Sequence, residues 1–225
     1  MATLERKIAF RRFNIPILLL AAVGMLAVCN LRKTEESTVP YYNEASFTPV
    51  WNVDKEKAAK MHKVAAFRMT NQSGQVITHD NLKGKITLVN FFFTACQSVC
   101  PKMKDTMKKV QANFSGDQKV SFLSYSVTPD KDNVNKLAEY ALANKIPAKQ
   151  WNLLTGDKTK IYELARKSYF IEEEIGLSKS SKQFLHTENL VLIDGDGHIR
   201  GLYNGTLETE VPRITQDINE LLATM

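Results

Sequence analysis

The chain has 225 residues, of which 44% are hydrophobic and 24% are charged, and this composition predicts a globular protein with a substantial core. Its length suits one or two domains. The formal net charge is +6, but the lysines and arginines are scattered among acidic residues and form no basic block. This distribution indicates a solvated lysine-rich surface and argues against nucleic acid as a partner.

A basic segment followed by an uncharged apolar run opens the chain. Four lysines and arginines lie between positions 6 and 12, directly before residues 13–31, FNIPILLLAAVGMLAVCNL. This pattern predicts that residues 1–31 are either an uncleaved membrane anchor or a lipoprotein signal in which Cys29 becomes lipidated. In both interpretations the remaining chain lies on the extracytoplasmic, periplasmic face of the membrane, where disulfides persist.

Residues 32–62 have a different composition from the rest of the chain. They contain polar and turn-forming residues, two prolines and no sustained hydrophobic period, which predicts a tether. Several aromatic side chains in this segment indicate that it lies against the domain for part of its length. From residue 63 to residue 225, strand and helix signals alternate, and we expect one folded domain there.

The domain begins with a predicted hairpin, in which residues 64–69 and 75–78 flank a turn. Residues 85–93, KITLVNFFF, form a nearly continuous apolar run that is typical of a strand buried on both faces. Pro101 suits the first turn of the helix that follows, because its missing N–H costs nothing there. Further strands are predicted at 120–127, 151–156, 188–194 and 198–205, and further helices at 132–145, 157–169 and 208–225.

This order of elements predicts an α/β fold. Strands that alternate with helices form a parallel sheet, and the last two strands flank Asp194-Gly195-Asp196-Gly197, a strong hairpin turn that adds antiparallel strands. The expected architecture is a thioredoxin-like central mixed sheet flanked by helices. An extra N-terminal β-hairpin and the N-terminal membrane anchor complete the predicted chain.

Cys96 and Cys100 lie in the predicted loop between strand 85–93 and its helix. Sites in open α/β sheets form beyond the carboxyl ends of strands, and a helix N-terminus favours the thiolate form of cysteine. A disulfide between these residues would close a very short loop and would remove little chain entropy, so a structural role explains the pair poorly. The spacing suits a redox-active pair with a reversible disulfide, or two thiolates that bind one soft ion such as copper(I).

Four histidines are candidates for a third metal ligand. His62 lies in the tether, His79 at a predicted surface turn, and His198 directly after the hairpin turn, where we expect it to be exposed. His186 immediately precedes a predicted core strand and would lie at the end of the sheet. A structural or solvated role is the better expectation for any single histidine, and the strand context makes His186 the strongest candidate of the four.

Three segments together resemble the SCO/SenC family of membrane-tethered, thioredoxin-like copper proteins: TLVNFFFTACQSVCPKM, LSYSVTPDKD and FLHTENLVLIDGDGHIRGLYNG. The resemblance covers about residues 45–225. It implies that Cys96, Cys100 and His186 are the copper ligands. One position departs from the family pattern, because Thr128 stands where the family often has an aspartate. Asp130 is the nearby candidate to replace that carboxylate.

The resemblance implies a copper-binding assembly factor rather than an enzyme. Such a factor would deliver copper to the dinuclear copper centre of cytochrome c oxidase, or would reduce the thiols of that centre. Its expected partners are the copper-bearing oxidase subunit, other copper chaperones or thiol reductants, and the membrane through the N-terminus. Copper(I) is the expected ion, and binding of copper(II) stays open.

Two other functions use the same cysteines. An extracytoplasmic thiol–disulfide oxidoreductase needs the dithiol but no metal, so His186 would be dispensable for it. A peroxidase of the peroxiredoxin or glutathione peroxidase type is the weakest hypothesis, because Phe93 stands where a peroxiredoxin has a threonine three residues before its reactive cysteine.

Overall fold

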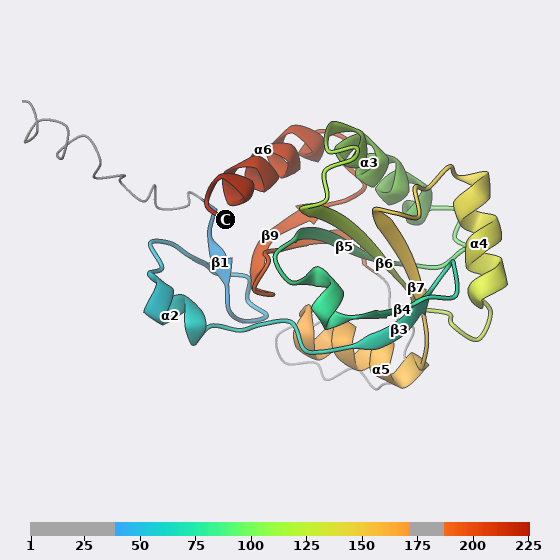
Figure 1. Ribbon diagram of the computed structural model, residues 1–225, viewed down its shortest axis with the longest axis horizontal. Coiled ribbons are helices and arrows are strands. Elements are labelled where there is room, and N and C mark those ends of the chain that lie inside the picture. The colour runs from blue at the N-terminus through green and yellow to red at the C-terminus, as the bar shows by residue number, and fades with distance from the viewer. Residues whose placement is uncertain (1–38, 172–186) are drawn as a thin grey trace, which may run out of the picture. The chain divides into compact units, whose positions relative to one another are not determined.

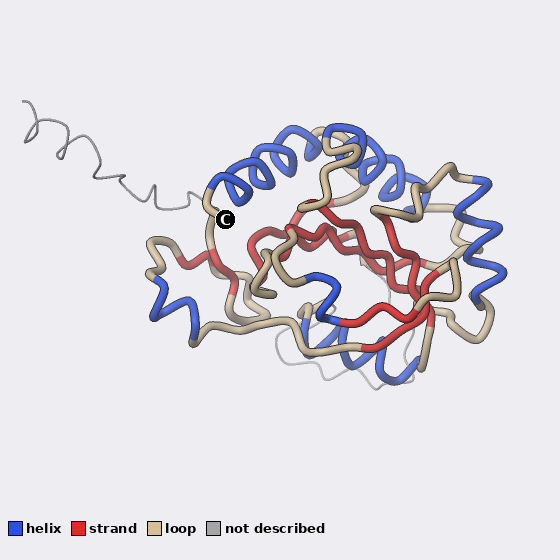
Figure 2. Tube along the Cα trace, in the orientation of Figure 1, coloured by secondary structure: helices blue, strands red, loops and turns tan. Residues whose placement is uncertain are grey.

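The computed structural model describes residues 39–171 and 187–225, and Figure 1 labels the helices and strands. Strands form the middle of the fold and helices lie around them (Figure 2). In chain order the elements are β1 (Tyr41–Tyr42), β2 (Pro49–Val50), α2 (Lys55–Ala59), β3 (Arg68–Asn71), β4 (Val76–Thr78), the 3-10 helix η1 (His79–Leu82), β5 (Ile86–Phe92), α3 (Val99–Asn113), β6 (Val120–Ser126), α4 (Val134–Ala143), β7 (Trp151–Thr155), α5 (Lys158–Glu163), the π-helix η2 (Leu164–Ser168), β8 (Asn189–Ile193), β9 (Ile199–Asn204) and α6 (Glu210–Ala223).

The described strands form one mixed sheet, in the order β2-β1-β9-β8-β5-β6-β7-β3-β4. β5, β6 and β7 are parallel neighbours, whereas β8 pairs antiparallel with both β5 and β9. The predicted α/β architecture with a central mixed sheet is therefore confirmed. The N-terminal hairpin is also present, since β3 and β4 pair antiparallel and β3 joins the sheet beside β7.

β5 and β6 lie in the middle of the sheet, and every residue of both strands is buried. The nearly continuous apolar run of β5 is typical of a strand covered on both faces, and β6 pairs beside it with its serines buried as well. Their parallel register aligns Ile86 with Val120 and Phe92 with Ser126. The two strands therefore end side by side, and the loops after Phe92 and Ser126 leave the same edge of the sheet.

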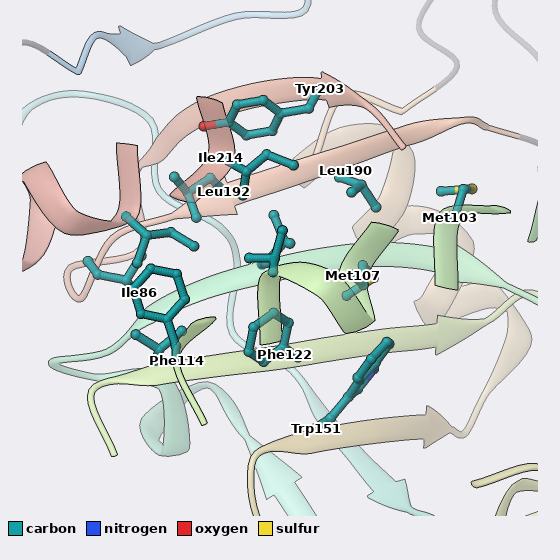
Figure 3. Close-up of a cluster of buried hydrophobic side chains, with 14 of the residues drawn as sticks. Ile86, Met103, Met107, Phe114, Phe122, Trp151, Leu190, Leu192, Tyr203 and Ile214 are labelled. Carbon is teal, nitrogen blue, oxygen red and sulfur yellow. The ribbon is translucent and has the colours of Figure 1, made fainter. Parts of the chain in front are cut away.

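Two layers of buried side chains cover the sheet. One layer packs α3, α4 and α6 on the first face, and Figure 3 shows Met103 and Met107 of α3 among strand residues such as Phe122. The second layer joins α5 and η2 to the other face. Full burial of one methionine, leucine, isoleucine or phenylalanine side chain contributes about 1.5–3 kcal/mol to the stability of the fold, relative to leaving it exposed. This packing fixes α3, whose first turn carries Cys100.

The segment predicted as a tether packs on the domain from Val39 onward. β1 pairs with β9, and the buried Arg200 donates hydrogen bonds to the Val39 carbonyl at 2.7 Å and the Pro40 carbonyl at 3.1 Å. Arg200 also forms an ion pair with Asp194 at 3.0 Å. The aromatic residues of this segment contribute as well, because the Arg200 guanidinium lies 3.8 Å from the centre of the Tyr41 ring.

His198 is buried, with an exposed fraction of 3%, and the prediction that it is exposed was wrong. Its Nδ1 lies 3.0 Å from the His62 carbonyl oxygen, and its backbone N–H donates to Asp194 Oδ1 at 2.9 Å. The Tyr41 ring contacts it edge-on. Strand β1 and the residues near His62 bury this turn. Contacts with such distant segments cannot be predicted from the sequence of the turn alone.

Two predictions fall outside the described residues. The apolar segment 13–31 and His186 both lie outside residues 39–171 and 187–225. Within residues 39–171 and 187–225, no helix combines the length and the apolar character needed to cross a membrane. The predicted helix 157–169 is present but changes its winding, from α-helix in α5 to π-helix in η2.

Candidate metal and thiol site

Cys96 and Cys100 lie where the prediction put them, at the junction of β5 and α3. Cys96 is partly exposed in the loop that follows Phe92, and Cys100 is the second residue of α3. Pro101 follows in the first turn of the helix, as expected. The exposed fraction of Cys100 is 5%, so one thiol faces the solvent side of the loop and the other faces the core.

Both cysteines are free thiols. The Cys96 backbone N–H donates to the Phe93 carbonyl at 3.2 Å, which closes a tight turn before the helix. The Cys96 Sγ lies 3.9 Å from Ser98 Oγ. Ser98 precedes the helix, and its side chain makes no cap hydrogen bond, so backbone N–H groups at the helix start are available to the sulfur.

These contacts set the pKa of the Cys96 thiol. Burial alone would raise it, but hydrogen bonds from the Cys100 thiol, from the backbone of Ser98 and Cys100 and from the Ser98 side chain outweigh burial. The pKa of Cys96 is therefore below its ordinary value. A thiol at a helix N-terminus that is partly exposed and has a lowered pKa is a good nucleophile and a good metal ligand.

Cys100 has the opposite character. It packs with Phe92, Met103 and Tyr140 in the layer under α3. Burial, and then its hydrogen bond with Cys96, raises the pKa of Cys100 to about 12. Burial likewise raises the pKa of Tyr140 to about 12, with further contributions from the two cysteines. The pair is thus asymmetric, with one accessible thiol and one protected thiol.

The buried carboxylate of Asp132 lies beside the loop that joins β5 to α3 and carries Cys96 (the cysteine loop). Its exposed fraction is 1%, and it accepts hydrogen bonds from Thr94, Ser126 and Thr128. Asp130, the candidate replacement for the carboxylate missing at Thr128, is instead exposed and lies 3.8 Å from Lys158 Nζ. Sequence reasoning missed Asp132, although the LSYSVTPDKD segment that it ends already pointed to this strand end.

His186, the third predicted ligand, lies outside the described residues. Among residues 39–171 and 187–225, no group of three histidine, cysteine, aspartate or glutamate side chains is placed to hold a metal ion. Two of the described histidines have other contacts, since His62 Nε2 lies 2.8 Å from the Ser168 carbonyl oxygen and His198 is buried against His62. The two thiols are therefore the part of the site that the described residues contain.

The donor set fits a soft metal ion. Two thiols at the junction of a strand and a helix can bind one copper(I), and the same two sulfur atoms can form a reversible disulfide. A structural zinc site would need four ligands, and the described residues supply no second cysteine pair for one.

The fold and this site define a thioredoxin-like domain with a dithiol between a central strand and its helix. The family model described as SCO1/SenC matches residues 55–223, and the chain belongs to that family.

Solved structures of the same family are similar to the chain over most of their length. A SCO1/SenC family lipoprotein from Bacillus anthracis str. Ames is 30% identical, with a TM-score of 0.62, over 72% of this chain and 95% of that one. BsSco, described as a cytochrome c oxidase assembly protein with a disulfide switch, is 29% identical, with a TM-score of 0.61, over 72% and 94%. Bradyrhizobium japonicum ScoI, solved with copper bound, is 25% identical, with a TM-score of 0.56, over 72% and 99%.

Proposed function

We propose that the protein is a copper-binding assembly factor that delivers copper to the dinuclear copper centre of cytochrome c oxidase. Cys96, Cys100 and His186 bind the ion in this proposal, and residues 63–225 form the copper-binding domain. The observation that carries the proposal is the pair of free thiols, Cys96 in the loop after β5 and Cys100 in the first turn of α3, in a SCO1/SenC domain. The copper-bound relative and the oxidase assembly relative support it.

Copper is the cargo of this reaction, and the chain supplies its ligands. Binding of one copper(I) by two thiols releases two protons, because only thiolates are ligands. The partly exposed Cys96 is the first sulfur that an incoming ion meets, and the buried Cys100 is the second. Oxidation of the pair to a disulfide leaves no thiolate, so it releases the ion, and bound copper protects the pair from oxidation.

The position of β8 supports His186 as the third ligand. β8 runs antiparallel to β5, with Val89 opposite Val191 and Thr87 opposite Ile193. The beginning of β8 therefore lies at the edge of the sheet where β5 ends and the cysteine loop begins. Thr187, two residues before β8, is the neighbour of His186 in the sequence.

The asymmetry of the thiols favours a second function, an extracytoplasmic thiol–disulfide oxidoreductase. In this reaction the Cys96 thiolate attacks a client disulfide, and one client sulfur leaves as a thiolate. Cys100 then attacks the Cys96 sulfur, which frees the second client sulfur and leaves a Cys96–Cys100 disulfide. An external thiol reductant must restore the dithiol. Preparation of the copper centre of the oxidase could use this reaction without any metal.

A copper(I) competition titration separates the two functions. The reduced full-length chain with Cys29→Ser is titrated against a chromophoric copper(I) chelator, alone and with His186→Ala added. We expect one copper(I) per chain, and a loss of affinity of about 10- to 100-fold or more on removal of the histidine. His79→Ala is the matched control, because His79 lies beside Gly197 in the turn after β8, at the other end of β5.

Two results would contradict the copper assignment. Equal affinities in the His186→Ala and parent chains would exclude the histidine as a ligand. A parent chain that binds no copper(I) while it reduces a disulfide substrate would support the oxidoreductase instead.

We further propose that residues 1–31 hold the domain on the extracytoplasmic face of the membrane. The Bacillus anthracis relative is a lipoprotein, which supports membrane attachment. Mass spectrometry of the mature N-terminus tests this: a lipidated Cys29 indicates a lipoprotein, and an intact N-terminus indicates an uncleaved anchor. A soluble product cleaved beyond residue 31 would exclude both.

A further inference from the structure

Asp132 is a buried carboxyl group whose surroundings connect three elements of the fold. It follows β6 and directly precedes Asn133, the N-cap residue of α4. Its exposed fraction is 1%. Aspartate is rarely buried to this extent unless its oxygens are satisfied, so its contacts need an explanation.

Four donors satisfy the two carboxylate oxygens. The Thr94 hydroxyl donates to Oδ1 at 2.6 Å, and the Thr94 backbone N–H donates to Oδ2 at 3.2 Å. The Ser126 hydroxyl donates to Oδ2 at 2.6 Å and the Thr128 hydroxyl at 2.9 Å. Each group donates and the carboxylate accepts, so the arrangement replaces the water shell of the carboxylate.

The carboxylate takes its contacts from hydroxyl and backbone groups rather than from a cation. Within residues 39–171 and 187–225, no lysine, arginine or histidine forms an ion pair with Asp132. The interactions of the Asp132 carboxylate with the surrounding chain therefore depend on these four hydrogen bonds. Two of the four come from Thr94, which lies two residues before Cys96 in the same loop.

We propose that Asp132 is a positioning residue that holds the Cys96 loop against the end of β6. Its carboxylate fixes both the hydroxyl and the backbone N–H of Thr94, and so restricts the chain that carries Cys96 relative to Cys100 in α3. The next residue, Asn133, is the N-cap of α4, and the centroid of the Tyr140 ring in that helix lies 5.5 Å from the centroid of the Phe92 ring. The chain thus has a buried carboxylate at the site even though position 128 is a threonine.

The role in copper capture rests on the proposed function, whereas the role in holding the two thiols together does not. Two readouts keep them apart. The first is the copper(I) affinity of the reduced chain. The second is the equilibrium constant of the Cys96–Cys100 disulfide with reduced and oxidised glutathione, which needs no metal and reports how well the two thiols are held together.

Thr94 and Thr128 offer a matched pair of variants, because each hydroxyl donates to Asp132 but only Thr94 belongs to the cysteine loop. Thr94→Val removes the donor to Oδ1 and keeps the shape of the side chain. Thr128→Val removes one donor to Oδ2 and leaves the contacts of the loop in place. Thr94→Ser restores the hydroxyl. All are made in the full-length chain with Cys29→Ser, so that Cys96 and Cys100 are its two thiols.

We expect Thr94→Val to weaken copper(I) binding about tenfold, since loss of a group that orients a metal ligand costs about 10- to 100-fold. The disulfide equilibrium constant should fall by a similar factor. Thr128→Val should change either quantity by less than about threefold, and Thr94→Ser should return both to near the parent values. Thermal unfolding of each variant confirms that the chain is folded and shows whether the two valine variants lose similar stability.

Equal effects of Thr94→Val and Thr128→Val would overturn the proposal, because the carboxylate would then act only through general stability. An unchanged disulfide constant in Thr94→Val would also overturn it. If the parent chain binds no copper(I), the proposed function fails, and the glutathione equilibrium still decides whether Asp132 positions the loop.

Discussion

The two site thiols should differ widely in reactivity at neutral pH. The pKa of Cys100 is about 12, and that of Cys96 is below its ordinary value of 9.0. At pH 7 the thiolate fraction is about 1 in 10⁵ for Cys100 and above about 1 in 10² for Cys96, a ratio of at least about 10³. A more basic thiolate is the better nucleophile, with a Brønsted coefficient of about 0.4–0.5, and this reduces the advantage of Cys96 by a factor of about 15 to 30. Cys96 should therefore react at least about 30 times faster, and the burial of Cys100 widens the difference.

A pulse of iodoacetamide on the reduced full-length chain measures this ratio. Peptide mass spectrometry separates Cys29 from the peptides that contain Cys96 and Cys100. As the pH rises from 6 to 10, the labelling rate of Cys96 should rise and begin to level off at a lower pH than that of an ordinary thiol, because its pKa is lowered. The rate of Cys100 should still be rising at pH 10, because its thiol is then mostly protonated.

Comparable labelling of the two cysteines at pH 7 would refute this reasoning, and so would faster labelling of Cys100. The Cys96→Ala variant tests the cause. Burial is the larger reason for the high pKa of Cys100, and the hydrogen bond with Cys96 is the next one. Removal of Cys96 should therefore increase the reactivity of Cys100 while leaving it a slow thiol. An unchanged rate would show that the contact between the thiols contributes nothing.

Two further predictions concern stability. Gly195→Ala should lower the free energy of unfolding, measured in urea, by about 1–3 kcal/mol, because a Cβ there would lie 2.8 Å from Gly84 Cα. Gly156→Ala is the control: its Cβ would lie 3.4 Å from the flexible Met69 side chain, and its free energy of unfolding should stay within about 0.5 kcal/mol of the parent value. Equal losses in the two variants would contradict the packing argument. Burial raises the pKa of Asp217 above its ordinary 3.8, so its ionised form costs stability as the pH rises above that value. Asp217→Asn, which keeps an acceptor for the Tyr203 hydroxyl, should gain under about 1 kcal/mol at pH 7 and nothing at pH 3, and a gain that is the same at both pH values would show that the charge is not the cause.

The sequence predicts the central sheet well because its strands are decided by local composition. Residues 85–93 are a nearly continuous apolar run, and residues 120–127 combine serines with β-branched, aliphatic and aromatic side chains; both segments contain strands in which every residue is buried. The hairpin β8–β9 is equally local, since its turn residues are adjacent in the chain. The cysteine loop follows from these elements, because it joins one predicted strand to one predicted helix.

The missed features depend on contacts between distant segments. Asp130 and Asp132 are two residues apart in a polar stretch, and no local signal separates them. Burial of Asp132 arises because Thr94, 38 positions earlier, reaches it from the next strand end. Burial of His198 likewise depends on His62, 136 positions earlier. Hydrogen-bonded partners so far apart in the sequence can be recognised only after the strand order is known.

The register of β5 and β6, more than the CxxxC spacing alone, determines the geometry of the site. Phe92 pairs with Ser126, and the Val127 backbone N–H donates to the Phe92 carbonyl at 2.9 Å, so the two strands separate at the same level. Only in this register can Thr94 and Ser126 donate to one carboxylate. A shift of one residue would reverse the faces of the strand and move Thr94 away from Ser126 and Asp132, which both belong to the β6 segment. Two cysteines with the same spacing after a strand in another register would keep the thiols but lose the carboxylate that holds their loop.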